Sequence, residues 1–474
     1  MTARRVAVIG GGLAGITAAV ALRDAGVDVT LLESRPWLGG SASSFARGPM
    51  MIDTGQHVFL RCCAAYQDLL ARLGVTGSVA IQDRFDVTVL SPAAKARLRR
   101  TSLPSPLHLA GALARYPLLT LAERARVGRA ALAFQRCDPA APELDSARLG
   151  DWLAARGQGE RARRRLWDLF IVSALNIAGD DASVSLAATV IKTALLGRKD
   201  AADIGMATVP LSHLHGTAPA ELLARLGARV RFGARAASIE PRQGGGFEVL
   251  LTPGRASAPA ADPAEAHGSP VVADAVVLAV PPGQAARLGA TAGITQASGW
   301  DGLGYAPIVN VHVVYDRQVT DLPFAAGVDS PVQWVFDKTG PAGLEAGQYL
   351  AVSLSAADSY VDVPAAELRA QFLPALEQLF PAAAGAAVTD FFVTRERRAT
   401  FRQAPGCGAL RPGAGTSVPG LVLAGAWTDT GWPDTMEGAV RSGHNAAQEL
   451  IRELAWLPSA GHTADLDSAR TGAP

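Results

Sequence analysis

The sequence predicts an α/β fold in which a Rossmann-type nucleotide-binding domain is interleaved with a second domain of the α+β class. The first observation is a glycine-rich turn that follows an apolar run within the first 15 residues. The second is a similar pattern of apolar run, loop and helix near residue 430. Between them, leucine- and arginine-rich helical patterns alternate with further strand patterns, so we expect each domain to be built from separate stretches of chain.

The N-terminal turn has the glycine spacing of a dinucleotide-binding site. Residues 6–9 form a short apolar run typical of a buried strand, and a helical pattern follows over residues 13–22. In the G-x-G-x-x-G spacing, the first glycine allows the tight turn, the second lets the backbone approach a pyrophosphate, and the third lets helix and strand pack closely. The helix N-terminus offers free N–H groups to the phosphates. The residues expected at the nucleotide are Gly10, Gly12, Leu13, Ala14 and Gly15.

An acidic residue follows the second apolar run at the position where a ribose would be bound. The run covers residues 27–32, and Glu33 lies 18 residues after Gly15. A carboxylate at this place accepts a hydrogen bond from a free ribose 2′-hydroxyl, so the sequence favours FAD or NAD over NADP. Beyond it, paired glycines with small hydroxyl residues suit a second backbone approach to the cofactor. The further cofactor contacts expected here are Ser34, Arg35, Gly39, Gly40 and Ser41.

Bulk composition narrows the class of protein. With 474 residues, 49% of them hydrophobic, the chain is long enough for two or three domains with sizeable cores. A net charge of +1 gives no electrostatic reason to expect a nucleic-acid partner. The four cysteines show no metal-binding spacing, so we expect no metal site and a reducing compartment. Because no apolar run is long enough to span a bilayer and the first strand lies close to Met1, we expect a cytoplasmic protein, at most attached to the inner face of the cytoplasmic membrane.

The domain prediction follows the changes in pattern. The nucleotide-binding domain is expected to comprise residues 1–84, 215–300 and 396–457. The substrate-binding domain is expected to comprise residues 85–214, mostly helical, and 301–395, and the tail at 458–474 is expected to be disordered. Helices are predicted at 64–73, 220–226, 365–380 and 435–454, strands at 52–60, 228–232, 247–251, 275–280, 308–315 and 421–425, and a loop at 253–270.

One stretch of the helical insertion, residues 103–134, combines many leucines with arginines. A basic amphipathic helix of this kind can lie on a membrane surface and would suit an entrance for an apolar substrate. The same pattern is typical of a helix that covers a core with its apolar face and exposes its charged face to water. The sequence leaves both interpretations open, and it leaves the oligomeric state open as well.

The stretch 424–443, AGAWTDTGWPDTMEGAVRSG, is the second informative motif. A buried strand leads into a loop and then into a helix, whose N-terminus suits the electron-rich edge of a flavin ring because reduction places negative charge there. The motif supplies a place for a ring system that a bare NAD site lacks, and so it favours FAD. The expected flavin contacts are Gly425, Ala426, Trp432, Thr435, Met436, Glu437 and Gly438.

The GGGLAG turn with Glu33 and the 424–443 motif together resemble the amine-oxidase and phytoene-desaturase superfamily of FAD enzymes. Residues 53–63, DTGQHVFLRCC, resemble the squalene-associated, desaturase-like branch of that superfamily. The resemblance implies the FAD-binding fold of the amine oxidases and a reaction in which FADH2 reduces hydroxysqualene, a C30 isoprenoid, to squalene for hopanoid synthesis. Members commonly carry an acid directly after the Ala-Gly of the last strand, where this chain has Ala426.

Removal of an allylic hydroxyl requires an acid for the departing oxygen and hydride at the carbon, which reduced FAD delivers from its N5. His57 is the first candidate acid, because it follows a turn expected to face the flavin and histidine titrates near neutrality, although a structural role suits it equally well. Asp180 and Asp181 are further candidates that also fit a solvated turn before a helix. Aromatic faces would stabilise a developing allylic cation. The expected pocket residues are Phe59, Asn176, Trp334, Trp427 and Trp432, and the turn adds Gly55, Gln56 and His57 as flavin contacts.

Two other flavin reactions and one non-enzymatic role stay open. A carotenoid desaturase or isomerase would use the same motifs, with hydride moving toward the flavin. A flavin amine oxidase often places a lysine near N5, and none of Lys95, Lys192, Lys199 and Lys338 sits in a motif that marks it. A flavoprotein that only binds lipid is the third alternative, and Ala426 would favour it.

Overall fold

In the computed structural model, which describes residues 4–252 and 269–456, a five-stranded parallel sheet carries the N-terminal glycine turn. Its strand order is β10-β2-β1-β14-β20, and every neighbouring pair is parallel. All five strands coincide with predicted ones, so the sheet gathers segments from both ends of the chain. The strands are β1 (Arg5–Ile9), β2 (Asp28–Leu32), β10 (Arg229–Arg231), β14 (Ala275–Leu278) and β20 (Leu421–Leu423).

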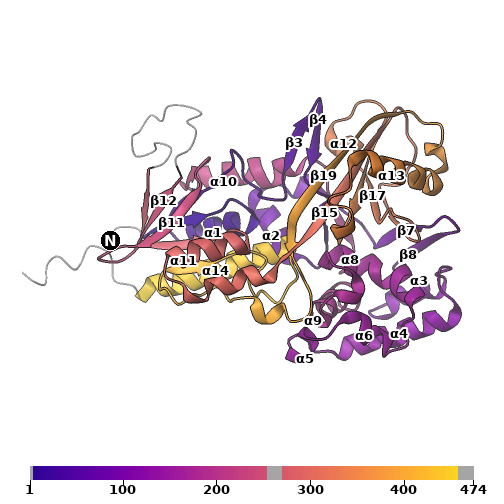
Figure 1. The fold of residues 1–474 in the computed structure, drawn as a ribbon, viewed down its shortest axis with the longest axis horizontal. Coiled ribbons are helices and arrows are strands. Elements are labelled where there is room, and N and C mark those ends of the chain that lie inside the picture. The colour runs from indigo at the N-terminus through magenta and orange to yellow at the C-terminus, as the bar shows by residue number, and fades with distance from the viewer. Residues whose placement is uncertain (1–3, 253–268, 457–474) are drawn as a thin grey trace, which may run out of the picture.

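Two helices from opposite ends of the chain pack together on this sheet. Figure 1 shows α1 (Leu13–Asp24) in indigo beside α14 (Met436–Trp456) in yellow. Their approach depends on a glycine, because a Cβ built on Gly443 would lie 2.4 Å from the carbonyl oxygen of Ala14. The chain passes from β1 to β2 on one side, whereas β14 pairs on the other. The carboxyl ends of β1 and β14 therefore form a topological switch point, where doubly wound sheets bind ligands.

A seven-stranded sheet forms the second main layer. Its order is β19-β15-β18-β17-β16-β7-β8, and all pairs are antiparallel except β16 with β7. The structure differs from the predicted domain boundary between residues 395 and 396, because that boundary falls inside β19. The strands are β7 (Asp86–Leu90), β8 (Lys95–Arg99), β15 (Tyr305–Tyr315), β16 (Phe324–Gly327), β17 (Trp334–Asp337), β18 (Gln348–Leu354) and β19 (Val388–Phe401).

Segment 85–214, predicted to be mostly helical, also contains three strands. Two of them, β7 and β8, form one edge of the seven-stranded sheet, and β9 (Ile204–Ala207) pairs between β5 (Val58–Leu60) and β6 (Val79–Ile81). In β8 the basic side chains point to solvent while Ala96 and Leu98 are buried, so the arginines obscure a period of two in the sequence. The helices of this segment are α3 (Ala110–Ala114), α4 (Leu121–Arg136), α5 (Pro142–Asp145), α6 (Leu149–Ala154), α7 (Glu160–Ala162), α8 (Asp168–Leu175) and α9 (Val184–Val190).

Residues 103–134 do not form the single amphipathic helix that the sequence predicts. The stretch divides into α3 and α4, and α4 begins at a capping box formed by Thr120 and Glu123. The remaining predicted helices are present, and the first of them ends at Gly74 as expected, with a left-handed φ of 78°. They are α2 (Ala64–Leu73), α10 (Ala218–Arg225) and α13 (Ala365–Leu379). Most of the predicted loop at 253–270 and all of the tail at 458–474 lie outside the described residues.

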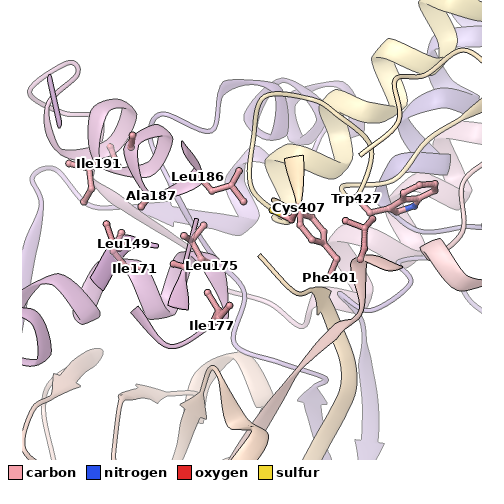
Figure 2. Packing of buried hydrophobic residues seen from close by; sticks show 14 of the residues in the cluster. Leu149, Ile171, Leu175, Ile177, Leu186, Ala187, Ile191, Phe401, Cys407 and Trp427 are labelled. Atoms are coloured by element: carbon pink, nitrogen blue, oxygen red, sulfur yellow. The ribbon is translucent and has the colours of Figure 1, made fainter. Parts of the chain in front are cut away.

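Buried apolar side chains run without a break from the helical segment to the C-terminal loop. Figure 2 shows Leu149 and Leu175 in the helical segment on one side and Phe401, Cys407 and Trp427 on the other, and all five belong to one cluster. Helical insertion and nucleotide-binding sheet therefore share a core. No helix within residues 4–252 and 269–456 is long and apolar enough to cross a bilayer.

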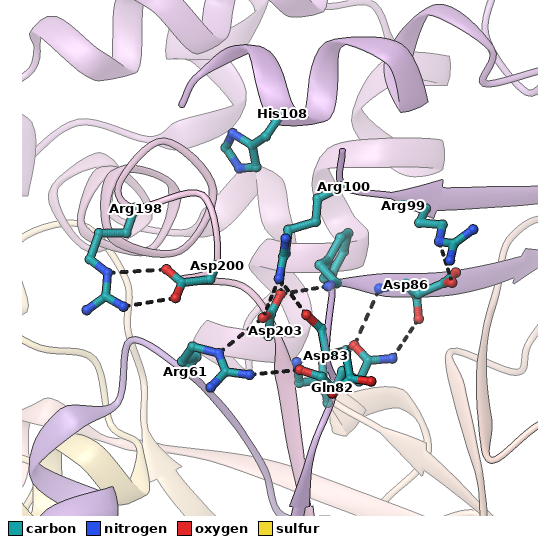
Figure 3. A network of polar contacts seen from close by, with 12 residues as sticks. Arg61, Gln82, Asp83, Asp86, Arg99, Arg100, His108, Arg198, Asp200 and Asp203 are labelled. Carbon is teal, nitrogen blue, oxygen red and sulfur yellow. Dashed lines mark hydrogen bonds and ion pairs between the residues drawn. The ribbon is translucent and has the colours of Figure 1, made fainter. Parts of the chain in front are cut away.

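A buried carboxylate also ties the segments around β9 together, as Figure 3 shows. The side chain of Asp203 has no exposed surface and accepts hydrogen bonds from Arg61, from Arg100 and from the backbone amide of Phe85. Burial by itself raises the pKa of Asp203, but these hydrogen bonds outweigh it and hold the pKa below its ordinary value. Asp203 is therefore ionised and fixes the ends of β5 and β8 against β9.

Candidate active site

The glycine turn after β1 forms a cradle made only of backbone. Gly10 has a φ of +110°, and a Cβ built on it would lie 2.2 Å from the carbonyl oxygen of Ala279. A Cβ on Gly15 would lie 1.9 Å from the carbonyl oxygen of Gly10, so this glycine permits the close packing of α1 on β1. Gly12 caps α1 without any side-chain hydrogen bond, and the first turn of α1 carries no acidic residue. The first amides of α1 are thus available for an anionic group.

A second pair of glycines closes the other side of this cradle. Gly39 donates its amide to the carbonyl oxygen of Gly11 over 2.8 Å, and both Gly39 and Gly40 have positive φ angles. A Cβ on Gly40 would lie 3.1 Å from the Cα of Gly12. Two glycines therefore face each other without side chains, which matches what a pyrophosphate passing between them requires. Arg35 spans the same loop, because its guanidinium donates to the carbonyl oxygen of Gly40 over 2.9 Å.

Glu33 lies at the ribose end of the cradle and is already held in place. Its Oε2 accepts the amide of Gly11 at 2.7 Å, while Oε1 accepts the amide of Arg35 at 2.7 Å and the hydroxyl of Ser34 at 3.0 Å. A carboxylate has about four lone-pair sites, so Glu33 keeps capacity for a ribose hydroxyl. The donor set fits the adenosine half of a dinucleotide.

The loop before α14 is organised by a buried arginine. Arg411 donates to the carbonyl oxygens of Ala426, Thr428 and Trp432. Gly425, whose φ is +142°, donates its amide to the hydroxyl of Ser442 on α14. This places the predicted flavin contacts together at the N-terminus of α14. Those with partly exposed side chains are Trp432, Thr435 and Met436.

The predicted flavin contact by Glu437 is corrected by the structure. Its side chain has no exposed surface and accepts the amides of Ala65 and Tyr66 in the first turn of α2, while Arg441 pairs with it at 2.8 Å. Glu437 therefore joins α14 to α2 and has no surface left for a ligand. Close packing also explains why residue 438 is a glycine, because a Cβ on Gly438 would lie 2.5 Å from the carbonyl oxygen of Pro433.

Beside the 53–58 turn lies a cavity of about 220 Å³. Its wall combines apolar residues with a smaller number of polar ones. The apolar wall is Val58, Ala80, Met206, Ala207, Pro323, Phe336 and Pro341. The polar part is Gln56, His57, Thr208, Asp337 and Lys338. An apolar cavity with a few convergent polar groups is the usual form of a small-molecule site, although this one is smaller than the roughly 300–1,000 Å³ typical of such sites.

His57 and Gln56, which the sequence predicts as flavin contacts, both border this cavity. The Nδ1 atom of His57 lies 3.1 Å from the carbonyl oxygen of Gly55. Burial lowers the pKa of His57, and the nearby charge of Lys338 lowers it further, against opposing contributions from that carbonyl and Asp53. The Nε2 atom of Gln56 is buried and has no hydrogen-bond partner among the described residues. A buried donor without a protein partner is available to an acceptor atom of a ligand.

Two charged residues that sequence reasoning missed complete this site. The ammonium nitrogen of Lys338 lies 2.8 Å from Oδ2 of Asp53, which is 3% exposed. The other carboxylate oxygen of Asp53 accepts the amide of Leu211 and the hydroxyl of Ser44. Lys338 follows β17 and Asp53 ends β4 (Met50–Asp53), so no local motif connects them. The only signal in the sequence was the scarcity of lysine, with Lys338 one of four.

Several predicted pocket residues are instead parts of the core. Phe59 is 4% exposed and packs against Gly205 and Tyr66, so its neighbour Val58 faces the cavity. Asn176 uses its side-chain amide to bind Ala306, Thr400 and Ala356. Trp427 is 3% exposed and donates to the carbonyl oxygen of Val280. Of the predicted tryptophans, Trp334 and Trp432 keep exposed surface; the ring of Trp334 stacks on that of Phe336, a residue of the cavity wall.

Asp180 and Asp181 are not positioned as the predicted acids. Both side chains are about half exposed, at 53% and 54%, and they pair with Arg163 and Arg148 respectively. Neither borders the cavity that contains His57. The plainer interpretation, a solvated turn, is the one that the structure supports. No group of three or more metal-ligating side chains occurs within the described part of the chain.

The fold and the backbone cradle define a Rossmann-type dinucleotide-binding protein, and a separate cavity lies beside its 53–58 turn. The chain belongs to the flavin-containing amine oxidoreductase family, whose sequence profile matches residues 13–451. Membership and the donor set of the cradle agree on FAD as the cofactor. Residues of the turns at Gly10–Gly15, Glu33 and Gly39–Gly40 would hold its adenosine diphosphate.

The chain is also similar to individual proteins. The chain is 32% identical over 462 residues to hydroxysqualene dehydroxylase of Rhodopseudomonas palustris, covering 94% of this chain and 98% of that protein. It is 27% identical over 488 residues to the zeta-carotene desaturase of Zea mays, covering 94% and 82%. Among solved structures, cyclohexylamine oxidase from Brevibacterium oxydans matches with a TM-score of 0.70 and 20% identity, covering 96% and 100%. That last likeness shows the fold alone, and it confirms the predicted FAD-binding architecture.

Proposed function

We propose that this protein removes the hydroxyl group of hydroxysqualene to give squalene, with reduced FAD as the source of electrons. The observation that carries the proposal is the cavity beside the 53–58 turn, whose wall combines an apolar part with polar residues that include Gln56, His57 and Lys338. A long hydrocarbon with one hydroxyl has the same division into apolar body and polar point. Hydroxysqualene dehydroxylases from Rhodopseudomonas palustris and Sinorhizobium fredii, at 32% and 28% identity, support the assignment.

The residues of the chain have two tasks in this reaction. The cofactor, when bound in its reduced form, would supply hydride to the substrate carbon. The apolar wall, including Val58, Met206 and Phe336, excludes water and holds the hydrocarbon beside the turn. The polar part holds the hydroxyl, because His57 and Gln56 offer an acceptor and an unpartnered donor among the lining residues. At about 220 Å³ the cavity receives the hydroxyl-bearing part of the substrate only.

A carotenoid desaturase is the second candidate, supported by zeta-carotene desaturases at 25–27% identity. Its substrate is a pure hydrocarbon, which would leave Lys338 and Gln56 without a ligand partner in an apolar site. An alcohol satisfies these groups and a polyene does not. This difference is the reason for preferring hydroxysqualene.

Anaerobic single-turnover experiments separate the two candidates. The dithionite-reduced holoenzyme is mixed with hydroxysqualene, phytoene or squalene in detergent, and flavin absorbance and products are followed together. We expect flavin reoxidation with hydroxysqualene alone, matched mole for mole by squalene. Reoxidation without squalene would overturn the proposal. Conversion of phytoene by the oxidised enzyme, with none of hydroxysqualene, would establish the desaturase instead.

We also propose that the protein meets its substrate at a membrane surface, through the outer face of α4. Leu121 and Leu132 are 79% and 49% exposed, and they lie 11 residues apart, close to three helical turns, on the face opposite buried Val127 and Phe134. Arg129 and Arg136 are exposed on the same side. The only acid of α4, Glu123, is engaged in the cap. Exposed leucines flanked by unopposed arginines suit a bilayer that contains anionic lipid.

A further inference from the structure

The cavity beside the 53–58 turn holds one residue, Lys338, whose hydrogen-bonding capacity exceeds what the protein uses. An ammonium group has three donors and no acceptor. Within the described residues, the only carboxylate within ion-pairing distance of Lys338 is Asp53, at 2.8 Å. The lysine side chain is 14% exposed and forms part of the cavity lining. Two N–H groups of a nearly buried cation therefore remain for a ligand in the cavity.

His57, on the same cavity, cannot supply a proton in the form that the structure holds. The carbonyl oxygen of Gly55 can only accept, so the Nδ1 atom 3.1 Å away from it must carry the hydrogen. Burial and the charge of Lys338 lower the pKa of His57, which keeps the ring neutral near pH 7. A neutral ring protonated on Nδ1 has a lone pair on Nε2. His57 is therefore placed to accept a hydrogen bond, and this argues against its role as the acid.

We propose that Lys338 is the proton donor to the departing hydroxyl of the substrate, while His57 accepts the hydrogen of that hydroxyl and orients it. The inference rests on the proposed function. In the step, the carbon–oxygen bond breaks, the oxygen takes a proton from the lysine ammonium and leaves as water, and the carbon gains hydride from the reduced flavin. Lysine becomes a neutral amine and recovers its proton from solvent.

The choice of lysine at this place is itself informative. The chain has 44 lysines and arginines together, and only four of these are lysines. Arginine pairs more strongly with carboxylates and serves for the buried Asp203. It does not give up its proton in proteins, whereas lysine does. The chain uses arginine for most of its basic positions, so a lysine beside Asp53 is consistent with a group that must transfer its proton to the substrate.

Two substitutions of Lys338 distinguish a role as proton donor from a role in which its positive charge only stabilises the structure. Lys338→Met removes both charge and proton, and Lys338→Arg keeps the charge beside Asp53 but not the transferable proton. We expect both to lower the single-turnover rate of squalene formation about 100-fold or more, within the range of general acid catalysis. Lys95→Met, at an exposed position of β8, is the matched control and should leave the rate unchanged. Restoration of the rate by Lys338→Arg would overturn the inference.

Binding to the oxidised protein provides a readout that does not depend on turnover. We expect the wild type to bind hydroxysqualene at least tenfold more tightly than squalene, because only the alcohol reaches Lys338 and His57. Lys338→Met should lose this preference, and Lys338→Arg should keep most of it. Thermal unfolding of each variant shows whether it is folded. Wild-type protein that makes no squalene refutes the proposed function, whereas an unchanged preference and rate in Lys338→Met refute the role of Lys338 alone.

Discussion

The carboxylate of Glu33 accepts a 2.7 Å hydrogen bond from the backbone amide of Gly11, which joins the end of β2 to the turn before α1. The acid that would bind the ribose also fixes the shape of the pyrophosphate cradle. We expect Glu33→Gln to weaken FAD binding about tenfold and Glu33→Ala about 100-fold, since each tenfold corresponds to about 1.4 kcal/mol. Titration of apoprotein with FAD by flavin fluorescence measures this. Glu240→Gln, at an exposed position, is the control, and unchanged affinity in Glu33→Ala would contradict the assignment.

Gly12 and Gly15 are three residues apart, but we expect their replacement by alanine to have different effects. One replacement should impair folding and the other should impair FAD binding. A Cβ on Gly15 would lie 1.9 Å from the carbonyl oxygen of Gly10, so Gly15→Ala should prevent stable folding. A Cβ on Gly12 would meet only the Cα of Gly40, at 3.9 Å, so Gly12→Ala should fold normally. Its methyl group would occupy the path of the pyrophosphate and weaken FAD binding at least tenfold. Thermal unfolding of the apoproteins combined with FAD titration distinguishes the two, and an unstable Gly12→Ala would disprove this division.

The features predicted correctly from the sequence are those with local signals. The strand, turn and helix at residues 5–24 repeat a fixed spacing, and the helix ending at Gly74 carries its own stop signal. Side-chain roles in the site were not predictable in the same way. Glu437 has its partners 371 and 372 residues away, and Lys338 meets Asp53 across 285 positions, so only the tertiary fold joins them. The sequence does not distinguish Phe59 from Val58 as the residue that faces the cavity, because a strand alternates faces and the pattern does not say which face is buried.

The buried contact between Asp203 and its two arginines should contribute strongly to stability. Asp203→Asn leaves Arg61 and Arg100 without their charged partner, and we expect a loss of about 3 kcal/mol in the free energy of unfolding at pH 7. Because the folded pKa of Asp203 lies below its ordinary value, its contribution is present above about pH 4 and is lost as pH falls through the folded pKa. Urea denaturation at pH 7 and in acid measures both effects. If the free energy of unfolding of Asp203→Asn fell in acid as steeply as that of the wild type, the role assigned to Asp203 would be contradicted.

The outer face of α4 provides a direct test of membrane contact. Replacing Leu121 and Leu132 with glutamine removes its two exposed leucines without touching the buried face. We expect the double variant to bind vesicles of phosphatidylcholine with phosphatidylglycerol at least fivefold more weakly than the wild type in co-sedimentation. Leu410→Gln is the matched control, because Leu410 is 43% exposed but lies in another part of the fold. Equal losses in the control, or a wild type that does not bind vesicles, would exclude α4 as a docking face.

We expect protonation of His215 in acid to weaken the part of the structure that supports the Gly39–Gly40 turn of the cofactor cradle. Its Nδ1 donates to the carbonyl oxygen of Ala42, beside the Gly39–Gly40 turn, and its Nε2 accepts the hydroxyl of Tyr66, each at 2.8 Å. Burial lowers its pKa to about 4. The unfolded chain binds the proton at about pH 6.5, so the stability that the neutral ring provides is fully present above that pH and is lost as pH falls toward 4. The loss amounts to something on the order of 3 kcal/mol.

Substitution of His215 should therefore change the pH dependence more than the stability itself. His215→Gln keeps a donor and an acceptor but does not titrate. We expect it to be somewhat less stable than the wild type at pH 7 and to lose less stability between pH 6.5 and pH 4. FAD retention on desalting should follow the same pattern, because protonated His215 cannot accept the hydrogen of Tyr66 and the turn that it supports loosens. Parallel curves of unfolding free energy against pH for the two proteins would show that other groups, such as His312, account for the acid sensitivity.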